Sequence, residues 1–124
     1  MDRYLAAAQQ VGGATVVAAA TSAASVKALR ELGDMLKARL HSTVIVLAAI
    51  IDGRPQFVAM VTPDLVERSL HAGRLLQHVV AITGGGAGGS PQMAQGGGVE
   101  PGRLEEALAA VFPWVQEHLE REGP

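Results

Sequence analysis

The sequence predicts one α/β (α+β) domain, in which a mixed β-sheet of about four to five strands packs against helices. Three observations predict this fold class. The length of 124 residues suits a single domain with a core of its own. Two runs, Ala14–Ala20 and Thr43–Ile51, are almost wholly apolar, as in strands that helices cover on both faces. Amphipathic helical stretches separate the apolar runs along the chain.

The first part of the chain is expected to be helical and then to enter the sheet. Residues 2–10 are prone to form a helix, although alone they are too short for a stable one. Residues 1–12 are therefore interpreted as the remnant of an upstream helical part or as a linker, and residues 13–124 as the globular domain. The strand Ala14–Ala20 is followed by a helix to about Leu40, in which apolar side chains recur at helical spacing.

The middle of the chain is predicted to be a β-hairpin. The strand Thr43–Ile51 ends at Asp52-Gly53, a pair that strongly favours a tight turn. Gln56–Val61 is then the return strand, and Arg54-Pro55 is expected to lengthen the loop between the two strands.

A long helix with one interruption is expected after the hairpin. Thr62 or Asp64 caps its start, and the helical pattern continues to about Thr83. His71-Ala72-Gly73 interrupts the apolar stripe, so that we expect a bend or a fresh helix start there.

A glycine-rich segment and a closing helix complete the predicted domain. Thr83–Gly98 (TGGGAGGSPQMAQGGG) contains eight of the chain's 15 glycines. Met93-Ala94-Gln95 lies between two glycine runs and is interpreted as one short strand that adds to the sheet. Pro101–Glu122 is predicted to be a helix that is broken or kinked near Pro113.

The composition excludes several kinds of site and indicates a soluble, cytoplasmic protein. The chain has no cysteine, which excludes disulfides and cysteine-based zinc or iron–sulfur sites. It begins without a secretory signal pattern, and its longest apolar run, Val44–Ile51, is too short to span a bilayer. Residues 1–99 carry eight Lys and Arg against six Asp and Glu, whereas residues 100–124 carry two against six. The mildly basic charge of residues 1–99 is therefore compatible with an RNA-facing surface but does not by itself indicate one.

Three interpretations compete for the glycine-rich segment. Gly84, Gly86 and Gly89 match the G-x-G-x-x-G pattern of dinucleotide binding. That motif needs a strand before it and a helix after it, whereas here a helix precedes the segment and Ser90-Pro91 follows. A nucleotide-binding P-loop needs a lysine, and the last lysine of the chain is Lys37. The third interpretation is a surface of backbone N–H groups that hold phosphate or sugar oxygens. Close packing of two backbones and a mobile loop remain alternatives.

Neither metal binding nor catalysis is expected of this chain. The four histidines show no metal-ligand spacing, so we predict no metal site. No nucleophile, base and acid can be grouped from their spacing, so we predict no catalytic residue. His71 and Arg74 lie near an expected helix start, where anions bind readily, and an ordinary surface pair is the equal alternative.

One continuous stretch resembles a known family. DLVERSLHAGRLLQHVVAITGGGAGGSPQMAQGGG is similar to the signature of the C-terminal domain of alanyl-tRNA synthetase. That signature is a D-L-V segment, H-A-G-K/R-L, a glycine-rich run and R-P-D-M-A-Q-A-G-G. The flanking strand and helices resemble the family too, so the resemblance covers nearly the whole chain. This domain belongs to the wider DHH-associated family, which also occurs in DHH phosphoesterases.

The resemblance implies a part of a larger enzyme that is not itself catalytic. The parent would be similar to alanine–tRNA ligases, which use ATP, magnesium and zinc in upstream active sites, so no cofactor is expected in this fragment. The domain would bind the elbow of tRNA-Ala, accompany the upstream domains and, in some members, take part in a homodimer; no membrane contact is expected. The alternatives are a domain of a DHH-type phosphoesterase, a dimerisation module, and a stand-alone editing protein as the parent.

The hypothesis for the RNA-binding surface combines the glycines with nearby polar side chains. RNA elbows are recognised mainly through shape, backbone and stacked bases, which suits a surface of glycine amides. We therefore expect RNA contacts from His71, Arg74, His78, Gly84, Gly85, Gly86, Gly88, Gly89, Ser90, Gln92 and Gln95. Ser90 stands where the family commonly has arginine, and Gln92 where it has aspartate. The missing arginine would remove one charge-assisted phosphate contact.

Overall fold

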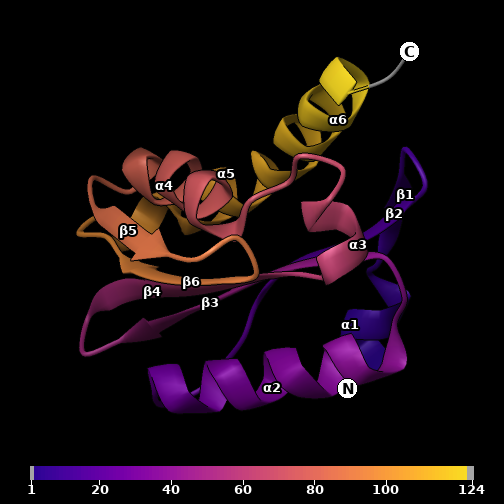
Figure 1. Cartoon of the computed structure of the whole chain (residues 1–124). Coiled ribbons are helices and arrows are strands. Elements are labelled where there is room, and N and C mark those ends of the chain that lie inside the picture. The colour runs from indigo at the N-terminus through magenta and orange to yellow at the C-terminus, as the bar shows by residue number, and fades with distance from the viewer. Residues whose placement is uncertain (1, 123–124) are drawn as a thin grey trace.

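The computed structural model describes residues 2–122, with side chains as far as Leu119. It shows one mixed β-sheet between two layers of helices, which confirms the predicted α+β single domain (Figure 1). The strands are β1 (Gln9–Val11), β2 (Ala14–Ala20), β3 (Thr43–Ile51), β4 (Arg54–Val61), β5 (Gly86–Gly89) and β6 (Met93–Gly97). The helices are α1 (Asp2–Ala6), α2 (Val26–Arg39), α3 (Pro63–Val66), α4 (Ala72–Ile82), a short 3₁₀ turn at Pro101–Arg103, α5 (Leu104–Ala109) and α6 (Val111–Glu122).

The strands lie in the order β1-β2-β3-β4-β6-β5 across the sheet. β2 and β3 are parallel, and α2 forms the crossover that parallel neighbours need. The other neighbours are antiparallel. At the turn of the β3–β4 hairpin, Asp52 and Gly53 have φ of 53° and 78°, as in a two-residue type I′ turn. Ile51 pairs with Arg54, so the expectation that Arg54-Pro55 lengthens the loop is wrong.

The sheet has six strands within the described residues, where about four to five were predicted. One of the additional strands is β1, since helix α1 ends at Ala6 and does not continue to residue 10 as expected. Gly12 and Gly13 adopt φ of 57° and 88°, which turns the chain back so that Gln9–Val11 pairs with β2. The expected boundary between residues 12 and 13 therefore cuts through a hairpin. The other additional strand is β5, whose glycines carry no strand propensity.

Both faces of the central strands are buried, which explains their continuous apolar sequence. On one face α2 packs on β3 and β4, and its Leu29 and Leu36 join Leu47 in one cluster. On the other face α4 and the closing helices pack on the sheet, where Leu76 of α4 and Phe57 of β4 belong to one buried cluster. Each large aliphatic side chain buried in this way contributes about 1.5–3 kcal/mol.

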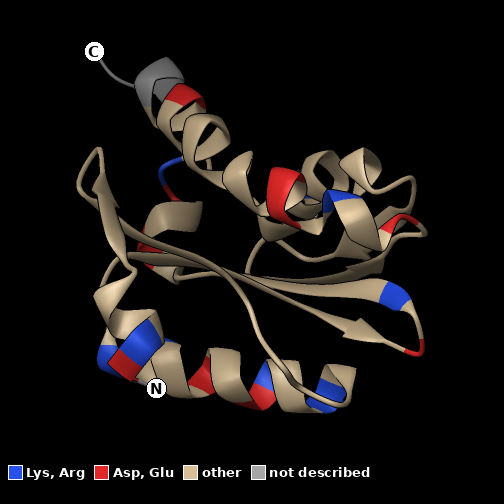
Figure 2. Cartoon of the chain, turned by 180° about the vertical axis from the view of Figure 1, so that it is seen from behind, with Lys and Arg blue, Asp and Glu red and all other residues tan. Residues whose placement is uncertain are grey.

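Both predicted helix interruptions are confirmed. The helix after the hairpin divides into α3 and α4, and Ser69, with φ of 72°, lies in the break. The closing helix divides at Ala110 into α5 and α6. Pro113 causes this break, because it lacks the N–H group that would bond to the carbonyl of Ala109. Glu105 and Glu106 lie on α5 and Glu117 lies on α6, and red segments mark acidic residues on these helices in Figure 2.

A hydrogen-bonded group of side chains joins the start of β3 to the start of α3. The hydroxyls of Ser42 and Thr62 each donate to a carboxylate oxygen of Asp64, the Thr62 bond at 2.6 Å. These bonds lower the pKa of Asp64 below its ordinary value of 3.8. Folding thus favours the ionised carboxylate. The ionised carboxylate of Asp64 therefore stabilises the folded state above pH 3.8. This stabilisation is lost as the pH falls through the lower pKa that Asp64 has in the folded state.

Replacing Asp64 by asparagine is expected to lower the melting temperature by a few degrees at neutral pH, because the amide is a weaker acceptor for the two hydroxyls. The difference should shrink in acid, where the wild-type carboxylate is also neutral. Thermal unfolding by circular dichroism, at neutral pH and in steps below pH 3.8, checks this expectation. A difference that stays constant down the acid series would contradict the assignment.

Candidate nucleic-acid interface

The glycine-rich segment forms an ordered hairpin at one edge of the sheet. β5 pairs with β6, with Gly86 opposite Gly97 and Gly88 opposite Gln95. The turn between the strands is closed by a 2.8 Å bond from the Ser90 amide to the Met93 carbonyl. The prediction of a short strand around Met93-Ala94-Gln95 is therefore confirmed, and the segment forms two paired strands.

Some of these glycines end helix α4 or allow two backbones to approach closely. Gly84, with φ of 80°, ends the helix, and the amides of Gly84 and Gly85 bond back to the last turn at 3.0 and 3.3 Å. A Cβ on Gly96 would lie 2.5 Å from the Cβ of Ala87, and one on Gly98 would lie 2.6 Å from the Cβ of Thr83. Side chains at Gly85 and Gly89 would likewise overlap the neighbouring backbone. Packing therefore requires glycine at these positions.

Gly86 and Gly88 are different, because nothing in the fold requires them to be glycine. A Cβ on either residue would meet no atom within 4 Å, and neither residue has the positive φ that favours glycine. Glycine within a strand costs about 0.5–1 kcal/mol relative to alanine, and often marks a place where a ligand or another backbone approaches closely. The bare stretch of β5 is thus a candidate contact surface.

The bare stretch lies on the face of the sheet that α4 leaves open. Ala87 packs into the cluster beneath α4, so its neighbours Gly86 and Gly88 face the opposite side. Met93 of β6 packs with the cluster beneath α2, and Gln95 follows it on this same face. We call the surface formed by Gly86, Gly88 and Gln95 the glycine face.

The start of α4 is closed by the glycine hairpin. The amides of Ala72 and Gly73 donate to the carbonyls of Pro91 and Ser90 at 2.8 and 3.2 Å. The Nδ1 of His71 accepts from the amide of Arg74 at 3.2 Å, which makes His71 the N-cap. His71 therefore lies at a helix start, as expected, but the amides there are already bonded. An anion could be held at this place only by side chains.

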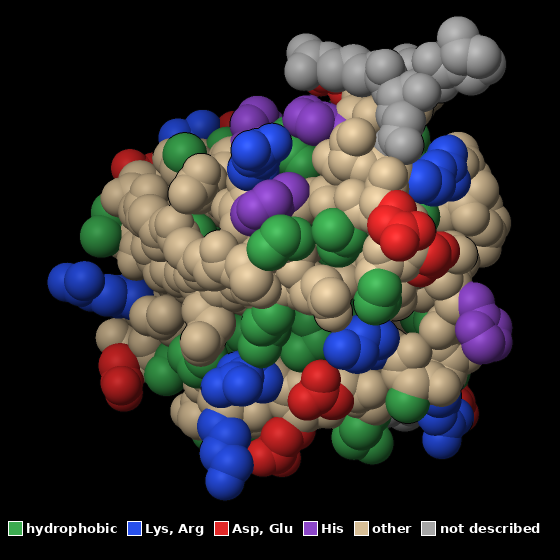
Figure 3. Space-filling view, in the orientation of Figure 1, with side chains coloured by type: hydrophobic (Ala, Val, Ile, Leu, Met, Phe, Trp, Pro, Cys, Tyr) green, Lys and Arg blue, Asp and Glu red, His purple; other side chains and the backbone are tan. Residues whose placement is uncertain are grey.

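The expected site residues are divided between two surfaces. Arg74 and His78 are exposed one turn apart on the outer side of α4. Histidine and basic side chains gather over that helix in the space-filling view (Figure 3). The glycine face lies on the other side of β5 and β6. The Ser90 hydroxyl is used within the hairpin, where it lies 3.2 Å from both the amide and the carbonyl of Met93.

Gln92 lies in a groove that sequence reasoning missed. The groove has a volume of about 220 Å³ and runs between α2 and the sheet. Its lining residues are Arg30, Asp34, Lys37, Met60, Gln92 and Met93. The charged residues of α2 lie outside the apolar stripe of that helix. Their spacing shows that they share a side of the helix, but only the fold shows what lies opposite.

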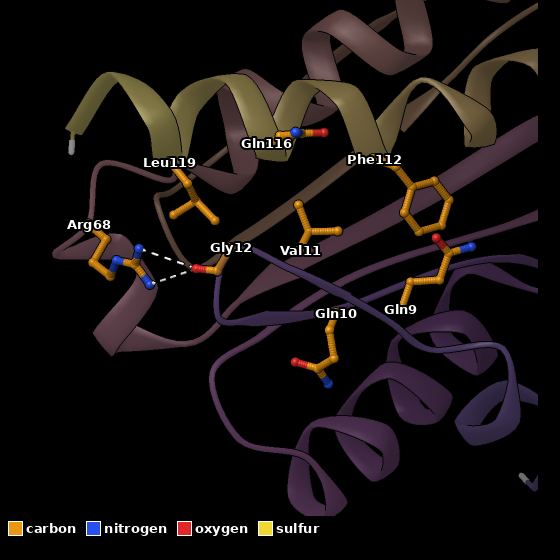
Figure 4. A pocket seen from close by; sticks show the side chains of 8 residues that line it. All are labelled: Gln9, Gln10, Val11, Gly12, Arg68, Phe112, Gln116 and Leu119. Atoms are coloured by element: carbon orange, nitrogen blue, oxygen red, sulfur yellow. Dashed lines mark hydrogen bonds between the residues drawn. The ribbon is translucent and has the colours of Figure 1, made fainter.

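A larger hollow of about 440 Å³ lies at the far end of the sheet. It is bordered by the β1–β2 hairpin and α6, and Arg68 donates from its guanidinium to the carbonyl of Gly12 at 3.4 Å (Figure 4). None of the expected RNA-binding residues lines it.

The described residues show neither a metal-ligand cluster nor a membrane-spanning helix. Among the side chains that the structure describes, residues 2–119, no group of three or more His, Asp or Glu is placed to hold a metal ion. None of the helices in this range combines the length and the apolar character that crossing a bilayer requires.

Comparison with known proteins gives consistent matches. The model of the DHHA1 domain matches residues 12–117. The alanine–tRNA ligase of Bacillus subtilis is 47% identical over 90% of this chain, and that of Aromatoleum aromaticum is 48% identical over 95%. The chain spans only 13% of the length of each of these relatives. Among solved structures, the C-Ala domain of Aquifex aeolicus alanyl-tRNA synthetase superposes with a TM-score of 0.80 at 27% identity, over 88% of this chain and 97% of that one.

Proposed function

The chain belongs to the DHHA1 domain family, and from this premise we propose that it is the non-catalytic, tRNA-binding C-terminal domain of an alanine–tRNA ligase. The resemblance seen in the sequence is confirmed by the named relatives and by the C-Ala fold. The alternative of a DHH-type phosphoesterase is less favoured, because the relatives are alanine–tRNA ligases.

The observation that carries the proposal is the glycine face. Gly86 and Gly88 leave a strand surface without side chains, although nothing in the fold requires glycine at either position. The sugar–phosphate backbone of RNA can lie directly on such a surface, and its 2′-hydroxyls and phosphates can then reach main-chain groups at the open edge of β5. Gln95 supplies an amide that both donates and accepts hydrogen bonds on the same face.

We propose that the partner is the elbow of tRNA-Ala. Binding at the elbow would keep the tRNA on the parent enzyme while the acceptor end of the tRNA moves between the aminoacylation and editing sites. In this proposal the upstream domains hold ATP, magnesium and zinc, and the whole enzyme acts in the cytoplasm. Gln92 would provide a polar contact beside the glycine face, and Arg74 and His78 would provide contacts from the outer side of α4. A homodimer through upstream parts would present two such domains.

Binding of tRNA-Ala across a salt series tests the proposal, with a tRNA of another identity as the control. Both tRNAs should bind, and with similar affinity, because a backbone surface reads shape and not sequence. The affinity should fall as salt is raised, with a log–log slope of about 0.7–0.9 for each phosphate contact. Absence of binding to either tRNA, with the fold intact by circular dichroism, would contradict the proposed function.

A further inference from the structure

The groove beside α2 offers positive charge next to the glycine face. Arg30, Asp34 and Lys37 form the wall that α2 contributes. They follow one another at i, i+4 and i+7, which places them on one side of the helix. Met60 and Met93 lie on the sheet side of the groove, so long apolar side chains separate the charges from the core.

The two cations of this wall are free to meet an anion. Among the side chains described here, neither Arg30 nor Lys37 lies within 4.0 Å of an acidic partner. The neighbouring Lys27 is different, because it is paired with Glu31 at 4.0 Å on the outer side of the helix. Asp34 stands between the two cations, so the groove carries two positive charges and one negative charge.

The groove leads onto the glycine face. Met93 lines the groove, and Gln95 follows it two residues later on the same face of β6. Gln95 is paired with Gly88 of β5. The glycine face and the groove are therefore neighbours on the same side of the sheet.

We propose that Arg30 and Lys37 bind phosphates of the tRNA backbone at the point where the RNA leaves the glycine face. In this proposal the carboxylate of Asp34 repels the same phosphates and so lowers the affinity for tRNA. This inference rests on the proposed tRNA-binding function and adds a second contact element, α2, to it. The glycine face positions the backbone by shape, and the two cations attract its charge. Arg30 and Lys37 thus supply positive charge in place of the arginine that the family commonly has at the position of Ser90.

Charge reversal on α2 tests this assignment. Arg30→Glu and Lys37→Glu should each weaken tRNA-Ala binding about tenfold at low salt and reduce the salt slope by about 1. Arg39→Glu is the matched control, since it changes the net charge equally but lies nine residues after Arg30, on the opposite side of the helix. It should change the affinity by no more than about twofold. Asp34→Asn should tighten binding and steepen the salt dependence.

The outcomes separate this inference from the proposed function. If wild-type protein binds tRNA but Arg30→Glu and Lys37→Glu match Arg39→Glu, the role of α2 is overturned while the proposed function stands. If wild-type protein binds no tRNA, both fail. Weaker binding by Asp34→Asn would overturn the repulsive role of that carboxylate. All four positions are on the surface, so circular dichroism and melting curves should remain close to wild type.

Discussion

Replacing Gly86 and Gly88 together by valine is expected to weaken tRNA binding at least about tenfold while the domain stays folded. Each valine would place a branched side chain on the glycine face and hold the RNA backbone away from the strand. The loss of two or three close hydrogen bonds, each worth about 0.5–1.5 kcal/mol, is sufficient for this effect.

Folding should survive this double substitution because both positions open onto empty space. A Cβ at either residue meets no atom within 4 Å, and the backbone is not left-handed. Valine also has a higher strand propensity than glycine, so the free energy of unfolding should change by less than about 1 kcal/mol, and in the stabilising direction. A change in binding can then be assigned to the surface itself.

Gly102→Val provides the matched control. Gly102 is also exposed and also has no atom within 4 Å of a built Cβ, but it lies in the 3₁₀ turn before α5. It should leave tRNA affinity unchanged. Titration of tRNA-Ala into each variant, alongside urea unfolding, gives both quantities. A folded Gly86→Val/Gly88→Val protein that binds like wild type would rule out the glycine face as the contact surface.

Replacing Gly98 by alanine is expected to cost about 3 kcal/mol of folding free energy, the upper end of the usual cost of overpacking and a large part of the 5–15 kcal/mol typical of a domain. The new Cβ would lie 2.6 Å from the Cβ of Thr83 and would also overlap its hydroxyl. Thr83 cannot move aside, because its hydroxyl donates to the Val80 carbonyl at 2.8 Å. Its own carbonyl accepts from the amides of Val99 and Glu100 at 2.9 and 3.0 Å.

Urea unfolding of three proteins checks this expectation: Gly98→Ala, Thr83→Gly and the double variant. Removing the side chain of Thr83 should restore part of the stability lost in Gly98→Ala, so the two effects should not add. If Gly98→Ala had the same urea midpoint as wild type, the close approach of Gly98 to Thr83 would not be needed for stability. The contrast with Gly86 and Gly88 is direct, since all three residues come from the same glycine-rich segment.

Much of the scaffold could be predicted from local patterns. The apolar runs predicted β2 and β3, helical spacing predicted α2, and Asp52-Gly53 predicted the hairpin turn, because each pattern reports burial of side chains in its own segment. The interruption at His71–Gly73 and the break near Pro113 were also visible, since helix breakers act locally. The glycine-rich segment also carries the signature of the family to which the chain belongs.

The strands β1 and β5 could not be predicted from such patterns. Three residues at Gln9–Val11 are too few to show an alternation, and the four residues of β5 are almost all glycine. Both strands exist because a turn brings them beside a strand already in the sheet. Their formation depends on backbone pairing with a neighbour and not on their own side chains.

The sequence by itself determined the fold class, the central strands and the family, because these depend on side-chain patterns along the chain. Only the tertiary structure decided which glycines are needed for packing, since a glycine has no side chain and its neighbours come from distant residues. The same holds for the bonded start of α4, where carbonyls from Ser90 and Pro91 occupy the amides. It holds too for Arg30 and Lys37, whose position opposite Met93 arises when α2 packs across the sheet.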